Sequence, residues 1–199
     1  MGAVDSSGER GGRPAATTAH ELAAVAQRLF VAGGFEQTSI EDVAAAAGIS
    51  RRTFFRYFAT KADVLFADSP AELARLRDCL ADPAPGLTYQ EVVTRSVTTA
   101  LRLPPGEEEW ARQRAQLILT VPALQAHASV VFTAWRSAAA DFARTLQVAD
   151  PMFPLAVGHA VLAATLAAHE HWITEPGGAL ADALTGMLGL LLPPAPAPR

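Results

Sequence analysis

Residues 39–61 read SIEDVAAAAGISRRTFFRYFATK, and this stretch predicts two short helices separated by a glycine turn. Ser39 and Asp42 resemble a capping box, in which each side chain bonds the backbone N–H of the other residue. Four apolar residues then recur on one helix face, at Ile40, Val43, Ala44 and Ala47. Gly48 follows where a helix can end in left-handed backbone, and Ser50 is placed to cap the next helix. Together these signals predict a helix-turn-helix.

The second predicted helix carries the positive charge of this stretch. Phe54 and Phe58 lie four residues apart and are expected to face inward, which leaves the other large side chains mostly outside. The outward set is Arg51, Arg52, Phe55, Arg56 and Tyr57. The whole chain has a net charge of −4, but residues 48–61 contain four cations and no Asp or Glu. Because the local field matters more than net charge to a polyanionic partner, the helix predicts contact with DNA.

The residue types in this helix suit the two kinds of contact that a duplex offers. An arginine can pair with guanine through two hydrogen bonds or hold a phosphate, and the hydroxyls of Thr53 and Tyr57 suit phosphates or base edges. A solvated basic face on a structural helix is the alternative explanation of the charge. The capped helix and the glycine turn that precede it favour the DNA-binding interpretation.

Residues 21–67 resemble the N-terminal domain of TetR-family transcriptional regulators. The residues that carry the resemblance are LF at 29–30, GF at 34–35, TS at 38–39, AGIS at 47–50, TFFRYF at 53–58 and Lys61. The stretch SRRTFFRYF is most similar to the branch that contains mycofactocin-system regulators. LILTVPALQA at 117–126, with tryptophans following, is also similar to the C-terminal domain of that branch.

The resemblance implies a set of DNA-contacting residues and a palindromic or near-palindromic operator. The predicted set is Ser39, Ser50, Arg51, Arg52, Thr53, Phe55, Arg56, Tyr57 and Lys61. Lys61 is similar to the phosphate-binding lysine of the family. Phe55 departs from the family pattern, which usually has a tyrosine there, so its contact is expected to be packing against sugars. The first helix also departs, because Thr18, Ala19 and His20 stand where the family often places an arginine.

The composition favours an all-α globular protein. With 199 residues, of which 50% are hydrophobic and 18% charged, the chain can bury a sizeable core. Alanine and leucine dominate, and no run of alternating β-branched residues stands out. The single cysteine, Cys79, allows no intrachain disulfide and suits a reducing compartment. We find no signal-peptide pattern and no uncharged apolar stretch of the roughly 18 residues needed to cross a bilayer, so we expect a cytoplasmic protein without membrane contact.

Capping residues, prolines and glycines divide the chain into four parts with nine or ten helices in total. Residues 1–16 are expected to be a disordered arm, in which Arg10 and Arg13 are candidates for a minor-groove contact. The other expected parts are a helix-turn-helix domain at 17–67, a ligand-binding and dimerisation domain at 68–192, and a proline-rich tail at 193–199.

The last two long helices are apolar nearly all round, so each must be covered on more than one side. Burial within one subunit could account for this. The preferred hypothesis, which the resemblance also implies, is a homodimer in which two helices from each subunit form a four-helix bundle. Such a dimer would present two recognition helices to two half-sites, about 34–36 Å apart or at a comparable groove spacing.

Aromatic residues spread over several helices of the C-terminal part predict a small-molecule site between those helices. The candidates are Trp110, Leu117, Phe132, Trp135, His159 and Trp172. Ordinary core packing is the alternative for each of them. The resemblance implies an apolar or acyl-CoA-like effector, which would release a repressor from its operator if it prefers the conformation that does not bind DNA.

An enzyme is not expected. His169, Glu170 and His171 are adjacent and lack the four-residue spacing that puts two histidines on one helix face, so they are interpreted as a polar edge. The sequence has neither a glycine-rich phosphate loop nor a nucleophile elbow. We therefore predict no catalytic residue, metal or cofactor. An all-α oligomeric interaction module stays as an alternative, but it would leave the arginine-rich helix unexplained.

Overall fold

The computed structural model describes residues 18–146 and 148–195, and this part of the chain is entirely helical apart from turns and loops. The all-α prediction is confirmed, with nine α-helices and one 3₁₀ helix in the described ranges. Their bounds are α1 Ala19–Gly33, α2 Ile40–Ala46, α3 Arg51–Tyr57, η1 Ala62–Phe66, α4 Ser69–Ala81, α5 Tyr89–Ala100, α6 Glu108–Thr120, α7 Pro122–Thr145, α8 Phe153–Thr174 and α9 Leu180–Leu191. The predicted arm at 1–16 and the end of the predicted tail, 196–199, lie outside the described residues.

Local capping signals fix the ends of the first helices. Thr18 and Glu21 form a capping box at the start of α1, and Ser39 and Asp42 form one at the start of α2. Both α1 and the turn after α2 end in left-handed glycines, Gly34 with φ 88° and Gly48 with φ 65°. These residues place α2 and α3 in contact across a short turn, as predicted for a helix-turn-helix.

The N-terminal helices share a core that reaches into the C-terminal part. Phe30, Val43 and Phe54 are buried at its centre, and Phe58 closes it from the end of α3. Leu124 and Ala128 from the first turns of α7 are buried in the same cluster. The helices α1 to α3 therefore cannot rotate freely against α7, since both parts contribute to one apolar core.

A second core joins α4 to α9, and α8 lies at its centre. Trp172 and Val161 of α8 and Leu184 of α9 are almost completely buried there. Gly158 lets α8 approach α7 closely, because a Cβ at this position would lie 2.7 Å from the carbonyl oxygen of Arg136. This second core makes α7, α8 and α9 one packed unit.

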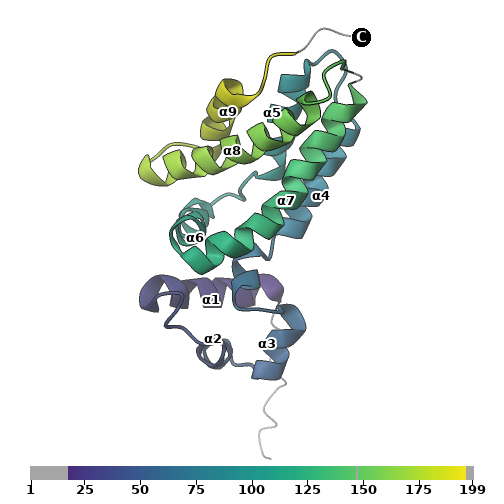
Figure 1. Ribbon diagram of the computed structural model, residues 1–199. Coiled ribbons are helices and arrows are strands. Elements are labelled where there is room, and N and C mark those ends of the chain that lie inside the picture. The colour runs from purple at the N-terminus through teal and green to yellow at the C-terminus, as the bar shows by residue number, and fades with distance from the viewer. Residues whose placement is uncertain (1–17, 147, 196–199) are drawn as a thin grey trace, which may run out of the picture.

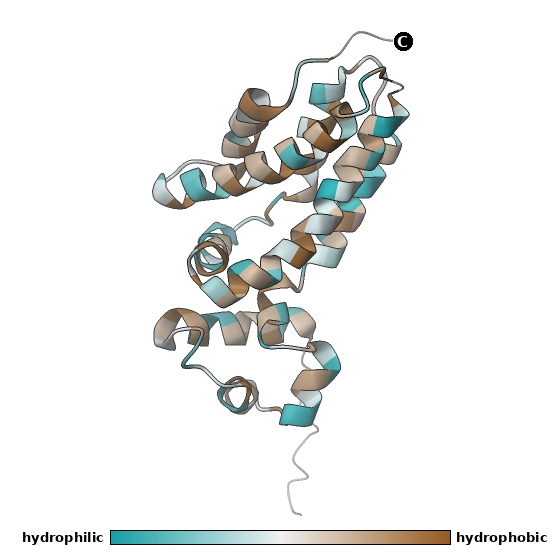
Figure 2. Ribbon diagram, in the orientation of Figure 1, coloured by the Kyte–Doolittle hydropathy of each residue, from teal (hydrophilic) through white to brown (hydrophobic). Residues whose placement is uncertain are grey.

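The elements are arranged along an elongated molecule (Figure 1). The helix-turn-helix occupies one end, whereas α8 and α9 lie toward the opposite end, side by side and antiparallel. Figure 2 shows apolar residues spread over α8 and α9 and a polar start to α3. No single helix in the described ranges has the length and apolarity to cross a membrane. Only α6 and α7 taken together reach that length and apolarity, and the chain bends by 101° between them.

Candidate nucleic-acid interface and internal pocket

The outer face of α3 presents three arginines at the end of the molecule. Arg51, Arg52 and Arg56 are exposed, whereas Phe54 on the inner face is fully buried. Phe55 is 43% exposed beside them, and its ring lies 5.4 Å from the guanidinium carbon of Arg51. The geometry matches the predicted division of the helix into a core face and a cationic face.

Arg51 is already paired within the chain. Its guanidinium lies 2.8 Å from a carboxylate oxygen of Glu41 on α2, and both side chains are more than half exposed. Because both groups stay in water, the pair is worth little and can be exchanged for a phosphate. The local positive charge around α3 is therefore lower than residues 48–61 alone indicate.

Two of the predicted contact residues use their hydroxyls for capping. The Oγ of Ser39 donates to Asp42 at 2.6 Å and accepts from the Asp42 backbone N–H at 3.1 Å. Ser50 accepts from the backbone N–H of Thr53, and the two hydroxyls lie 2.9 Å apart. The hydrogen bonds from Ser39 lower the pKa of Asp42, so its carboxylate stays ionised and holds the cap. These serines position the two helices whatever contact they make with DNA.

Tyr57 and Arg56 lie at the far end of α3. Tyr57 is half-buried against the first core and lines a hollow with residues of η1 and α7, so it is less outward than the sequence predicts. The guanidinium of Arg56 lies over the Tyr57 ring, 5.2 Å from its centroid. Arg56 thus covers the tyrosine ring while its charge stays exposed.

The ammonium of Lys61 is engaged with backbone carbonyls of the α1–α2 loop. Its Nζ donates to Phe35 O at 2.6 Å and to Thr38 O at 3.0 Å, and it lies 4.2 Å from the centroid of the Phe35 ring. An ammonium has three donors, so these bonds leave one for a phosphate. Sequence reasoning missed the structural role of Lys61, since its partners are more than twenty residues earlier in the chain.

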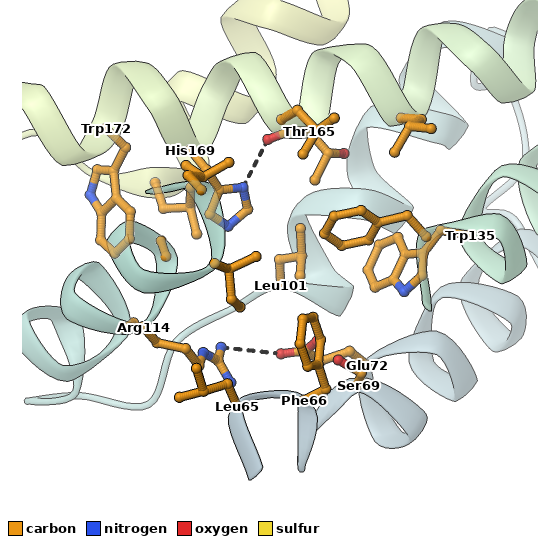
Figure 3. Close-up of a pocket in the computed structure, with 18 of the residues that line it drawn as sticks. Leu65, Phe66, Ser69, Glu72, Leu101, Arg114, Trp135, Thr165, His169 and Trp172 are labelled. Atoms are coloured by element: carbon orange, nitrogen blue, oxygen red, sulfur yellow. Dashed lines mark hydrogen bonds and ion pairs between the residues drawn. The ribbon is translucent and has the colours of Figure 1, made fainter. Parts of the chain in front are cut away.

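An internal pocket lies among α4, α6, α7 and α8, between the two cores (Figure 3). Its cavity volume is about 90 Å³, which is small beside the roughly 300–1,000 Å³ of typical ligand pockets. Most of the wall is apolar. The residues that line it include Leu101, Phe132, Trp135, Val161, Thr165, His169 and Trp172, with Glu72 and Arg114 at the base.

The charged groups at the base of the pocket are paired with one another. Arg114 lies 3.2 Å from a carboxylate oxygen of Asp68 and 3.5 Å from one of Glu72, and its side chain is only 16% exposed. Burial raises the pKa of Glu72, against the opposing effect of Arg114. With two carboxylates beside a single guanidinium, the base carries no excess positive charge.

His169 and Thr165 supply uncharged polar groups on the α8 wall. The His169 Nδ1 lies 2.8 Å from the carbonyl oxygen of Thr165. Burial lowers the pKa of His169, so the ring is neutral at neutral pH and Nδ1 is the donor of this bond. The buried hydroxyl of Thr165 has no hydrogen-bond partner in the protein.

Three of the six predicted ligand residues line this pocket: Phe132, Trp135 and Trp172. The other three lie elsewhere. Trp110 packs between His20 and Arg114 at the α1–α6 contact, and Leu117 packs into the first core. His159 is exposed on the outside of α8. The faces that these side chains occupy follow from how α6 and α8 pack, which aromatic content does not reveal.

His169 corrects the interpretation of residues 169–171 as a polar edge, because its ring turns into the pocket while Glu170 and His171 are exposed. A signal for this existed in the sequence. Thr165 and His169 continue the apolar face of Val161, at spacings of four residues each. Arg114 and Glu72 carried no comparable signal, since they meet only in the folded chain.

A helix-turn-helix with a cationic second helix, joined to a helical domain with its own pocket, defines a class of DNA-binding regulators. Residues 16–67 match the family model for bacterial regulatory proteins of the TetR family, and residues 87–196 match the model of the MftR C-terminal domain. The chain belongs to the TetR family of transcriptional regulators. The family resemblance stated from the sequence is thereby confirmed, and the family consists of DNA-binding proteins that regulate transcription, which are not enzymes.

Two curated relatives extend the comparison. The chain is 33% identical over 177 residues to a protein of Mycobacterium tuberculosis H37Rv named as the mycofactocin biosynthesis transcriptional regulator MftR, covering 88% of this chain and 89% of the relative. It is 45% identical over 47 residues to the HTH-type transcriptional regulator TcmR of Streptomyces glaucescens, covering 24% of this chain and 21% of TcmR.

Solved structures share the fold. The TetR-family repressor FadR of Thermus thermophilus, solved in complex with lauroyl-CoA, matches 92% of this chain and all of its own, with a TM-score of 0.56 and 25% identity. AibR, solved with isovaleryl coenzyme A and operator DNA, matches 89% of this chain and all of its own, with a TM-score of 0.51 and 17% identity. At that identity AibR supports the fold alone.

Proposed function

We propose that this regulator is a homodimeric repressor that binds a palindromic or near-palindromic operator through α3 and leaves it when an apolar effector enters the C-terminal pocket. The observation that carries the DNA-binding part is the exposed row of three arginines on α3, at the end of the molecule, on a helix whose opposite face is locked in the core. A rigid helix with one cationic face fits the major groove.

Different roles are proposed for the residues of this surface. Arg52 is exposed, and we assign it to base edges together with Thr53. Arg51, Arg56 and the remaining donor of Lys61 are assigned to phosphates. Phe55 packs against sugars, Tyr57 lies at the rim, and Ser39 and Ser50 hold the helix ends that face the backbone.

The proposed dimer surface consists of α8 and α9. Four of the seven large apolar side chains that are exposed in the described residues lie on or next to these helices: Met152, Leu155, Leu190 and Leu191. An apolar surface of this kind is typical of a subunit interface.

The apolar walls of the pocket support an effector with a hydrocarbon part. FadR binds lauroyl-CoA in a related fold, which supports an acyl-CoA-like molecule here. The cavity of about 90 Å³ would have to widen for such a ligand. Since α7 contributes to both cores, widening would move the DNA-binding end, and the ligand would then favour the conformation with the weaker DNA affinity.

Footprinting of the intergenic DNA upstream of the gene tests the proposal. We expect a protected segment with two half-sites related by a twofold axis, and a dimer in light scattering at micromolar concentration. Absence of any protected segment, or a monomer bound to a single half-site, would contradict it.

A regulator without a small-molecule effector is the alternative, favoured by the small cavity volume. A gel-shift assay of operator release distinguishes a regulator with a small-molecule effector from one without. Release of the operator by hydrophobic acids, thioesters or polyketides supports the effector, whereas no thermal shift and no release across those compounds supports the alternative.

A further inference from the structure

The pocket contains one buried hydroxyl, that of Thr165, which the protein leaves unsatisfied. Thr165 is 8% exposed, its Oγ1 has no hydrogen-bond partner in the protein, and it lines the pocket (Figure 3). A buried hydroxyl left without a partner costs about 1–3 kcal/mol, so the site gains by supplying one. The missing partner must enter through the pocket, because the protein offers none.

His169 places a second polar atom beside this hydroxyl. It follows Thr165 by four residues, which puts the two side chains on the same face of α8, and both line the pocket. Since Nδ1 donates to the Thr165 carbonyl, the neutral ring presents Nε2 as an acceptor. Thr165 can donate or accept, so the pair suits a ligand hydroxyl and can also hold a carbonyl through Thr165.

The base of the pocket argues against an anion. Arg114 is the guanidinium that lines it, and Asp68 and Glu72 already bind that guanidinium. If Glu72 is ionised, the three groups sum to one negative charge, and if it is protonated they sum to zero. In neither state does the base supply a positive charge to compensate a buried carboxylate, and the lone pair of His169 Nε2 would repel it.

We infer that the pocket selects its ligand by charge: it takes an apolar molecule whose buried polar group is an uncharged hydroxyl, held by Thr165 and His169, or an uncharged carbonyl, held by Thr165, and it rejects a free carboxylate. This inference rests on the proposed effector function and narrows it. A fatty alcohol, ketone, ester or thioester meets the requirement, and any charged head group on such a molecule must stay outside the pocket.

Three eight-carbon compounds that differ only in the polar end test the selection: 1-octanol, 2-octanone and octanoate. Binding is measured on the full chain by thermal shift and calorimetry at neutral pH. We expect the affinity for the alcohol and for the ketone to be at least about ten-fold higher than the affinity for octanoate, since octanoate buries an uncompensated charge. Equal or tighter binding of octanoate would overturn the inference.

Two variants connect the preference to named groups. Thr165→Val keeps the shape of the side chain without the hydroxyl and should weaken 1-octanol roughly ten-fold, whereas Thr174→Val, on the exposed side of the same helix, should change nothing. The double variant Asp68→Asn, Glu72→Gln leaves Arg114 without a carboxylate partner and should improve octanoate binding while leaving 1-octanol unchanged. Circular dichroism and the melting temperature without ligand verify that each variant folds.

The DNA-binding proposal can be separated from this one by measuring operator affinity on the same samples. If none of the three compounds binds while the protein still binds its operator, the charge-selective pocket is refuted and the DNA-binding function stands. If the double variant Asp68→Asn, Glu72→Gln leaves octanoate as weak as before, charge at the base is not what excludes it, and the inference is likewise refuted.

Discussion

Arg51 and Glu41 form an ion pair of 2.8 Å across the turn between α2 and α3. The pair places a negative charge on the surface that would face DNA. Glu41 therefore competes with phosphate for Arg51, and because both side chains are mostly exposed the competition is weak and sensitive to salt.

Replacing Glu41 with Gln is expected to raise DNA affinity about three-fold at low salt. The change removes a carboxylate that the DNA phosphates repel, and it ends the ion pair that competes with phosphate for Arg51. Fluorescence anisotropy with labelled operator measures the change. Asp78→Asn is the matched control, because Asp78 is exposed on α4 and the charge change is the same. An equal gain in both variants would mean that net charge, not the pair, is responsible.

Salt dependence tests how many cations reach phosphates. Four cations per subunit, eight per dimer, limit the slope of log affinity against log salt to about −7. We expect a shallower slope, since some arginines face bases. A slope steeper than this limit would show that cations outside residues 48–61 contribute.

Lys61→Met is expected to lower both stability and salt dependence. Loss of the two bonds from Nζ to the loop carbonyls should reduce the free energy of unfolding by about 1–3 kcal/mol, measured by urea denaturation. If the third donor holds a phosphate, the slope also becomes shallower by about 1.8 per dimer. An unchanged slope with lowered stability would assign Lys61 to the loop alone.

His169 predicts a pH dependence of stability. Burial depresses its pKa in the folded protein below the ordinary histidine value of 6.5, so the folded state binds fewer protons than the unfolded state. The stabilisation is present above pH 6.5 and is lost as the pH falls toward the folded pKa. His169→Gln should make the melting temperature less dependent on pH in this window. His159→Gln, on the exposed face of α8, should leave the dependence as in the parent.

Leu155→Glu combined with Leu190→Glu is expected to give monomers in light scattering, because two buried charges per subunit would oppose α8 and α9 packing across the twofold axis. Val130→Glu is the control, since Val130 is equally apolar and 74% exposed but lies on α7. A persistent dimer in the double variant would place the interface elsewhere.

Most of the fold was predictable because its signals are local. Thr88 and Glu91 cap α5 through bonds three residues apart, as the spacing indicates, and Gly48 ends its helix in the predicted left-handed backbone. The 3₁₀ helix after Lys61 has no comparable local signal. Such short elements depend on packing, here of Val64 and Leu65 in the first core.

The pocket was only half predictable for the same reason. His169 continues the helix face of Val161 and Thr165, whereas His159 does not, but only the position of α6 and α7 makes that face the wall of a pocket. Arg114 and Glu72 are 42 residues apart, so their pairing depends on the tertiary fold. Local patterns indicate which helix faces are apolar, and they do not indicate which of those faces enclose a cavity.

The most direct test of the DNA-binding account is the operator affinity of the double variant Arg52→Ala, Thr53→Val. Arg95→Ala, an exposed arginine on α5, is its control. We predict a loss of roughly 100-fold in affinity, with an intact dimer and an unchanged helical spectrum, since each base-contacting arginine contributes about 1–3 kcal/mol. Unchanged affinity in a folded, dimeric double variant would contradict the assignment of α3 as the recognition helix.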